Sequence, residues 1–88
     1  MRERLDTLRG EVDGLDKTIV ELIAQRIKLA VPIAEAKRAL GCEIYDEIRE
    51  RNILMRLDMY AQSLGIESGV IVRVYERIFE CMRGQQNG

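Results

Sequence analysis

The chain has 88 residues, of which 47% are apolar and only 5% aromatic, and it contains a single proline. This length is typical of one small domain with an aliphatic core, and chains this short often complete their burial by forming oligomers. The 14 basic and 15 acidic residues leave a formal net charge of −1, which excludes a global positive field that would attract nucleic acid or an anionic membrane.

Residue types that support metal or nucleophilic chemistry are scarce. Histidine is absent, and Cys42 and Cys81 do not have the spacing of metal ligands, so we expect no zinc site and no nucleophile activated by histidine. No apolar run approaches the roughly 18 residues of a membrane span, and the N-terminus lacks a secretory pattern. The sequence therefore predicts a cytoplasmic protein with reduced thiols, independent of membranes and nucleic acid.

The first predicted helix runs from about residue 3 to 40 and ends before Gly41. Its apolar positions recur at the steps of three and four that are typical of a long packed helix: Leu5, Leu8, Val12, Leu15, Ile19, Leu22, Leu29, Ile33 and Ala36. Pro32 removes one backbone donor and should bend the helix or split it near Lys28. We expect one bent helix, because the apolar stripe continues in phase across the proline.

Two shorter helices follow. One is predicted over about residues 46–64, with Asp46 as its N-cap, and the other over about residues 67–84. The sequence thus predicts a single all-α domain over residues 1–88, with one long and two shorter helices.

Polar residues interrupt the apolar faces of all three predicted helices: Arg26, Lys37, Asp46, Glu50 and Gln86. A charge on a buried face is costly unless it is paired, so each charged group needs either another residue or a ligand. One interpretation is a structural salt bridge between Arg26 and Glu50. The number of charges that can converge when the helices pack favours a ligand site.

Spacing along the long helix separates its basic residues into two groups. Arg26 and Lys37 are 11 residues apart, close to a whole number of turns, so they share a face at roughly 16 Å and can close on a small molecule between them. Arg9 lies 17 residues before Arg26, on another face and roughly 25 Å away. It is either a solvated surface charge or a residue that reaches a ligand held by an antiparallel partner subunit.

Four short motifs carry a resemblance to a known family. They are LRGEVD around Arg9, RIKLA from Arg26, AK at Lys37 and DEIRE, which contains Asp46, Arg49 and Glu50. In combination, and over nearly the whole chain, these motifs resemble the all-helical chorismate mutases. The resemblance implies an intertwined helical homodimer that rearranges chorismate to prephenate in aromatic amino-acid biosynthesis, with no metal and no cofactor.

The resemblance also implies a role for each residue. Arg26 and an Arg9 donated by the partner subunit would hold the two carboxylates of chorismate, and Arg49 would belong to the same network. Lys37 and Gln86 would donate to the ether oxygen of the breaking bond, and Glu50, with the Asp46 region, would position the ring hydroxyl. The implied catalytic residues are thus Arg26, Lys37, Glu50 and Gln86, with Arg9, Asp46 and Arg49 as further binding residues.

Two positions depart from the family pattern. Met82 aligns where the family often has a small hydroxyl residue, which would donate to a substrate carboxylate. Gly84 precedes Gln86 and disfavours helix, so Gln86 is expected to be frayed and Gln85 competes with it for the same role.

Two other functions fit parts of the pattern. An isochorismate pyruvate-lyase resembles this fold and uses a similar cationic pocket, although the cluster of Asp46, Arg49 and Glu50 favours the mutase. A non-catalytic regulatory or dimerisation module of a shikimate-pathway enzyme would have the same helices. The sequence does not distinguish a free-standing enzyme from a domain of a larger one.

Overall fold

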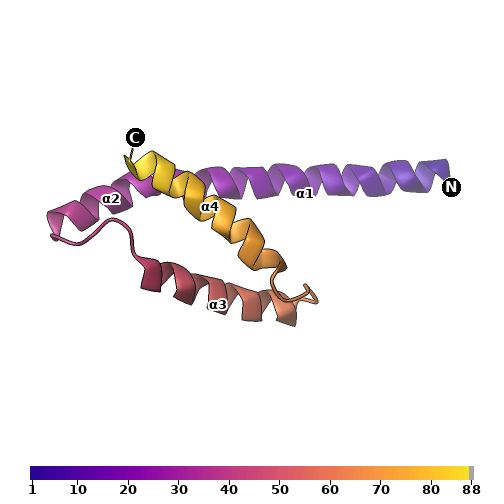
Figure 1. Ribbon diagram of the computed structural model, residues 1–88. Helices are drawn as coiled ribbons and strands as arrows, with labels where there is room; N and C mark the ends of the chain where they lie inside the picture. Colours follow the sequence, from indigo (N-terminus) through magenta and orange to yellow (C-terminus); the bar gives the residue numbers. More distant parts are fainter. Residues whose placement is uncertain (88) are drawn as a thin grey trace.

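The computed structural model describes residues 1–87, which form four α-helices: α1 (Arg2–Lys28), α2 (Ala30–Ala39), α3 (Glu47–Ser63) and α4 (Val70–Asn87). Within this range no strand occurs, so the predicted all-α fold is confirmed. The helices α1 and α2 follow one another as a bent rod, and α4 crosses the rod near the bend (Figure 1). On its other side α4 packs against α3, so it is the central element of the fold.

Leu29 separates α1 from α2, so the long helix predicted over residues 3–40 is divided in two. Because Pro32 has no N–H group, the carbonyl of Lys28 loses the donor that a continuous helix would supply four residues later. The N–H of Leu29 donates to the carbonyl of Arg26 at 3.1 Å, which is a tighter turn. The regular pattern resumes with the N–H of Ile33 and the carbonyl of Leu29 at 3.0 Å. The apolar stripe therefore keeps its phase, although the helix does not continue unbroken.

Residues at both ends of the loop between α2 and α3 determine where the two helices end and begin. Gly41 has φ +72°, and the N–H of Cys42 donates to the carbonyl of Lys37 at 2.9 Å, which together close α2 in a Schellman-type turn. Asp46 then caps α3, because its Oδ1 accepts from the N–H of Arg49 at 2.9 Å. This short loop lies beside Lys37 and so brings α2 and the start of α3 to the same place.

The helix α4 begins at Val70, three residues later than predicted. Residues 67–69 form a turn instead, in which Gly69 has φ +90° and its N–H donates to Oδ1 of Asp58 at 2.9 Å. Ser68 donates to the same carboxylate at 3.1 Å. At its other end α4 continues through Gly84 to Asn87, beyond the predicted end of the helix.

The core is small and lies where the bent rod meets α4. The buried residues there include Ala30 and Ala34 of α2 and Ile78 and Met82 of α4. The two alanines are almost fully buried, because their small side chains let the helices approach closely. Within residues 1–87, no helix has the length and apolar character needed to cross a membrane.

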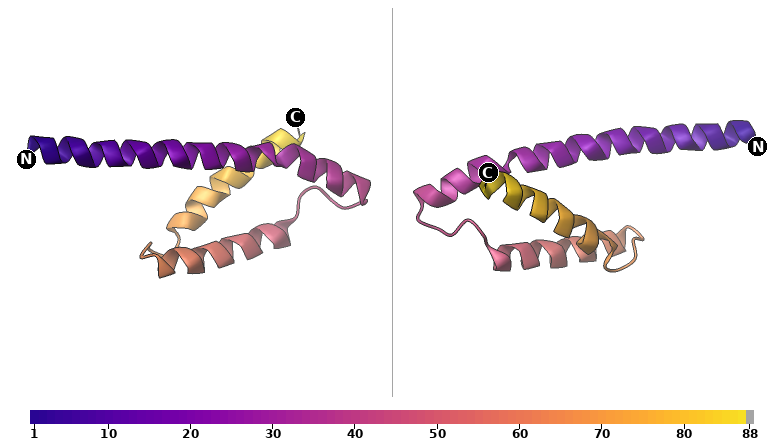
Figure 2. Two further views of the ribbon diagram at one scale, coloured as in Figure 1. Left: turned by 180° about the vertical axis from the view of Figure 1, so that it is seen from behind. Right: turned by 45° about the horizontal axis from the view of Figure 1, so that its top comes forward.

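The part of the bent rod up to Leu22 takes no part in this core, whereas Ile23 and Ile27 near the end of α1 pack against it. No residue of α1 is buried, and the members of its apolar stripe from Leu5 to Leu22 are 41–63% exposed. The chain exposes 7191 Å², whereas a compact monomer of this size exposes about 5,300 Å². Its radius of gyration is 16.8 Å, against about 12 Å for a compact domain. Figure 2 shows the cause, since α1 projects well beyond the other helices. The single subunit leaves its longest apolar stripe uncovered.

Candidate active site

A cavity of about 300 Å³ lies at the end of the molecule where all four helices contribute residues. Its walls include apolar side chains from α2, α3, α4 and the loop, and its polar groups come from every element. Four basic and two acidic residues line it, a formal excess of two positive charges. The lining residues are Arg26, Ile33, Lys37, Ile44, Tyr45, Asp46, Arg49, Glu50, Ile53, Phe79, Met82, Arg83 and Gln86. A small anion fits both the volume and the charge of this cavity.

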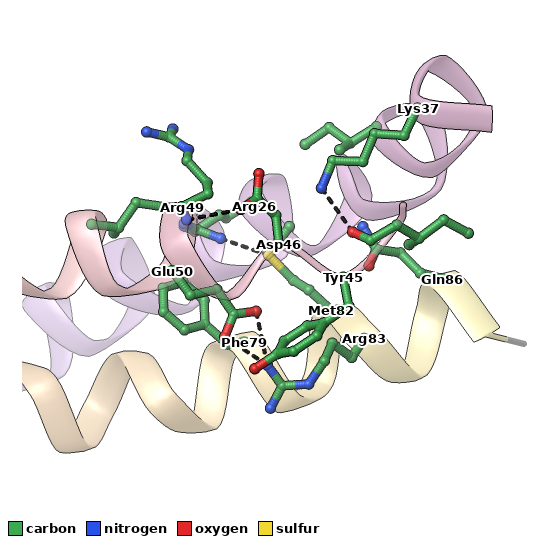
Figure 3. A pocket seen from close by; sticks show the side chains of 13 residues that line it. Arg26, Lys37, Tyr45, Asp46, Arg49, Glu50, Phe79, Met82, Arg83 and Gln86 are labelled. Atoms are coloured by element: carbon green, nitrogen blue, oxygen red, sulfur yellow. Dashed lines mark hydrogen bonds and ion pairs between the residues drawn. The ribbon is translucent and has the colours of Figure 1, made fainter. Parts of the chain in front are cut away.

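Arg26, in the last turn of α1, enters the cavity among apolar groups. Its guanidinium lies 5.4 Å from the ring centroids of Tyr75 and Phe79, and Nη1 is 2.6 Å from the sulfur of Met82 (Figure 3). A thioether is a weak acceptor, and aromatic faces only partly offset the desolvation of a cation. No carboxylate pairs with Arg26 in the described part of the chain. Its charge is therefore available to an anionic ligand.

Lys37 reaches the cavity from α2 and is half-buried there. Its Nζ donates to the backbone carbonyl of Ile44 at 2.7 Å, across the loop that follows α2. The Schellman-type turn at Gly41 folds this loop back over α2 and places the carbonyl within reach. Lys37 thus has one neutral partner and two further protons to donate.

Glu50 is paired, but not with Arg26. Nη1 of Arg83 donates to both of its carboxylate oxygens at 2.8 Å, and the Arg83 guanidinium also lies 5.4 Å from the ring centroid of Tyr45. The salt bridge between Arg26 and Glu50, considered from the sequence, is therefore absent from this structure. The reason is geometric, because the contact of α3 with α4 places Glu50 beside Arg83.

Arg83 is not among the site residues predicted from the sequence. It lies four residues after Phe79 and three before Gln86, both of which line the cavity, so helical spacing along α4 contained the signal. The predicted apolar face of that helix contains only uncharged residues and therefore does not include Arg83.

Asp46 and Arg49 line the cavity in different ways from Glu50. The Asp46 carboxylate is already engaged as the N-cap of α3. Arg49 is exposed, and Figure 3 shows its side chain directed away from the pair formed by Glu50 and Arg83. Asp46 therefore fixes the start of α3, and Arg49 is a cation at the rim of the cavity.

The C-terminal turn of α4 closes one side of the cavity. Gln86 lines it, whereas Gln85 is exposed and is not part of its wall. Nε2 of Gln86 donates to the carbonyl of Ala30 at 3.1 Å, and Nη2 of Arg38 donates to the backbone carbonyl of Gln86 at 3.3 Å. These contacts with α2 hold the turn in helical form beyond Gly84, so the fraying expected at Gln86 is not observed.

Arg9 is remote from this cavity. It lies on the exposed, projecting part of α1, about 25 Å along the helix from Arg26, and is not among the lining residues. The structure thus brings together Arg26, Lys37, Asp46, Arg49, Glu50 and Gln86 in one subunit and leaves Arg9 outside.

Comparison with known proteins agrees with the helical arrangement and the motifs. Residues 8–87 match the family described as chorismate mutase type II. The chorismate mutase of Methanocaldococcus jannaschii is 31% identical over 80 residues, which cover 91% of this chain and 81% of that protein. The T-protein of Enterobacter agglomerans is 32% identical over 78 residues, and the bifunctional chorismate mutase/prephenate dehydratase of Escherichia coli is 32% identical over 73 residues. This chain spans 21% and 19% of those two longer proteins. Because the match covers nearly all of its length, the chain belongs to the chorismate mutase type II family.

Proposed function

We propose that the cavity binds chorismate and that its residues accelerate the rearrangement of chorismate to prephenate. The observation that carries this proposal is the pair of basic groups, Arg26 and Lys37, which face the same cavity with only uncharged partners. Chorismate mutase activity, an isomerase reaction, is supported by the family and by the names of the relatives. Chorismate is a compact dianion, so it matches a cavity with two excess positive charges.

To accelerate this reaction, a protein needs only a cavity of suitable shape and suitably placed charges. In this intramolecular Claisen rearrangement the ether C–O bond breaks while a C–C bond forms, and no nucleophile, metal or redox group takes part. The flexible dianion must be held in a chair-like conformer, and negative charge that develops on the ether oxygen must be stabilised. These two tasks are orientation and electrostatic preorganisation.

The geometry supports a division of these tasks. Arg26 binds a carboxylate through its guanidinium fork, replacing its weak contact with Met82. Lys37 on α2 and Gln86 on α4 both line the cavity and donate to the ether oxygen. In the free subunit Lys37 donates to the backbone carbonyl of Ile44, and Gln86 donates to that of Ala30. The ether oxygen of the substrate can replace these acceptors or accept a hydrogen bond alongside them. Each donor is thus held in position before substrate arrives.

The acidic side of the cavity recognises the rest of the substrate. Glu50 accepts from the ring hydroxyl, and Asp46 keeps the start of α3 in place beneath it through the N-cap. Arg49, at the rim, joins the carboxylate network when substrate is bound. Its exposed position in the free subunit leaves its side chain able to turn towards the cavity.

A second copy of the chain completes the site. The uncovered apolar stripe of α1 and the excess exposed surface support an intertwined homodimer. In an antiparallel arrangement of two such arms, Arg9 of one subunit reaches the cavity of the other and supplies the cation for the second carboxylate. This proposal explains why a binding residue lies so far from the remainder of the site.

The test is turnover of chorismate by the purified chain, followed through loss of chorismate absorbance with identification of the product. Prephenate supports the mutase, whereas release of pyruvate from isochorismate, assayed in parallel, would identify the lyase instead. Lys37→Met should lower kcat by about a hundredfold or more, since it removes a donor to the developing charge. The matched control is Lys17→Met, at an exposed position of α1 outside the cavity and off the apolar stripe, and it should retain wild-type turnover. A Lys37→Met variant as active as Lys17→Met would contradict the proposal.

The cytoplasmic location stays a prediction.

A further inference from the structure

Arg83 joins three elements of the fold at one wall of the cavity. From α4 it contacts both carboxylate oxygens of Glu50 on α3, each at 2.8 Å. Its guanidinium also lies over the ring of Tyr45, in the loop between α2 and α3, at 5.4 Å from the centroid. Figure 3 shows the three side chains grouped together beside Met82. A change at Arg83 therefore reaches Glu50 directly.

The pair formed by Arg83 and Glu50 differs from the other ion pairs in residues 1–87. The pairs Arg51–Glu47 and Arg77–Glu80 each lie within one helix, and their side chains are more than half exposed. The side chains of Arg83 and Glu50 are only 35% and 24% exposed, and they join two helices. Exposed ion pairs within a helix contribute little to the stability of the fold, whereas a partly buried ion pair between two elements fixes the orientation of both side chains.

We infer that Arg83 is a positioning residue that orients the Glu50 carboxylate for the ring hydroxyl of the substrate. Each carboxylate oxygen accepts more than one hydrogen bond, so the contacts with Nη1 leave further lone pairs of Glu50 for a hydroxyl donor in the cavity. Without Arg83 the carboxylate is free to rotate and turns towards solvent. The inference rests on the proposed function, because it takes the hydroxyl contact of Glu50 as given.

Two simpler roles for Arg83 need to be separated from this one. Arg83 contributes one positive charge to the cavity, so its loss weakens the binding of any dianion. It also lines the cavity and has the chemistry to contact a substrate carboxylate itself. Both of these roles would affect all dianions equally, whereas orientation of Glu50 affects only ligands that carry the ring hydroxyl.

The experiment compares chorismate with an analogue in which hydrogen replaces the ring hydroxyl. The readout is the inhibition constant of the analogue divided by KM for chorismate, a ratio that net charge and the folded fraction leave unchanged. Arg83→Leu should lower this ratio roughly tenfold or more, as in metal sites when the hydrogen-bonded partner that orients a ligating side chain is removed. Arg83→Lys, which retains a charge and a donor, should recover part of the loss. Arg77→Leu, an exposed position on the same helix, is the matched control and should leave the ratio as in the wild type.

The same measurements with Glu50→Ala decide whether Arg83 acts through Glu50. In the Glu50→Ala background, Arg83→Leu should change the ratio by less than about twofold, because the two residues work as one unit. The inference would be overturned if, in Arg83→Leu, the inhibition constant of the analogue and KM for chorismate rose together and their ratio stayed at the wild-type value. Arg83 would then act through its charge or through direct contact with a substrate carboxylate. The inference would also be overturned if the two substitutions had independent, multiplicative effects on this ratio. Failure of the wild type to convert chorismate would instead contradict the proposed function itself.

Discussion

Arg26 is partly buried and has only weak interaction partners, an energetically costly environment for a cation. Its neighbours are two aromatic rings and a thioether, and the nearby Glu50 is held by Arg83. Desolvation of such a charge opposes folding unless a ligand carboxylate repays it. We therefore interpret Arg26 as a residue kept for binding rather than for stability.

The variant Arg26→Met tests this interpretation. Methionine retains an unbranched, apolar side chain that packs on Tyr75 and Phe79, so the free energy of unfolding should stay the same or rise. Turnover of chorismate should fall by about a hundredfold or more, since a carboxylate contact made in a water-poor cavity is lost. Thermal unfolding and kcat/KM are measured on the same preparation. A midpoint of unfolding lowered by more than about 5 °C, roughly 1 kcal/mol for a domain of this size, would assign Arg26 a structural role.

At the scale of the elements, the helix α4 contains a glycine where packing rather than propensity maintains the helix. Gly84 is exposed and has ordinary helical geometry, and a Cβ built there would meet no atom within 4 Å. Its helical state follows from the contacts that Gln86 makes with Ala30 and Arg38. The glycine itself adds only conformational freedom to the unfolded chain.

Gly84→Ala should therefore raise the free energy of unfolding by about 0.5–1 kcal/mol and leave KM for chorismate unchanged or slightly lower. The matched control is Gly65→Ala, at a position with φ +85°, where a side chain is strained and the free energy of unfolding should fall by about 1 kcal/mol or more. Denaturant titration of both variants gives the two values. A destabilised Gly84→Ala variant would show that this turn is not helical in solution.

Helix boundaries and faces were predictable from the sequence where a local signal sets them. Gly41 and Asp46 end and begin helices through contacts with residues at most five positions away. Helical spacing places Arg83 on the cavity face of α4, but its pairing with Glu50 was not predictable, because the two residues are 33 positions apart and meet only through the packing of α3 against α4. The continuation of α4 past Gly84 likewise depends on contacts with α2, which local propensity cannot reveal. Six of the seven residues that the resemblance singled out line one cavity, but the motifs could not show which partner each charge has.

At the scale of the whole molecule, the proposed homodimer shares each site between two subunits, because Arg9 would come from the partner. Arg9→Ala and Arg26→Ala should each be nearly inactive alone. When the two variants are unfolded and refolded together, mixed dimers contain one site with both substitutions and one site that is wild type at every position. With random pairing half of the dimers are mixed, so about a quarter of wild-type activity should return.

Mass spectrometry of the refolded mixture confirms that mixed dimers have formed. If they are present and activity does not return, Arg9 does not act across the interface. Sedimentation of the wild type provides an independent check, since a folded monomer at micromolar concentration would rule out an obligate dimer.

The uncovered arm α1 also affects how the molecule reaches its native state. The stretch of α1 up to Leu22 is exposed within its own subunit and so gains little from tertiary packing, and an isolated helix in water is only marginally stable. With a second copy as the covering surface, α1 becomes ordered in the collision of two chains, whereas α2 and α4 pack within one. Folding then contains a step that is second order in chain concentration, and its half-time lengthens in inverse proportion as the solution is diluted.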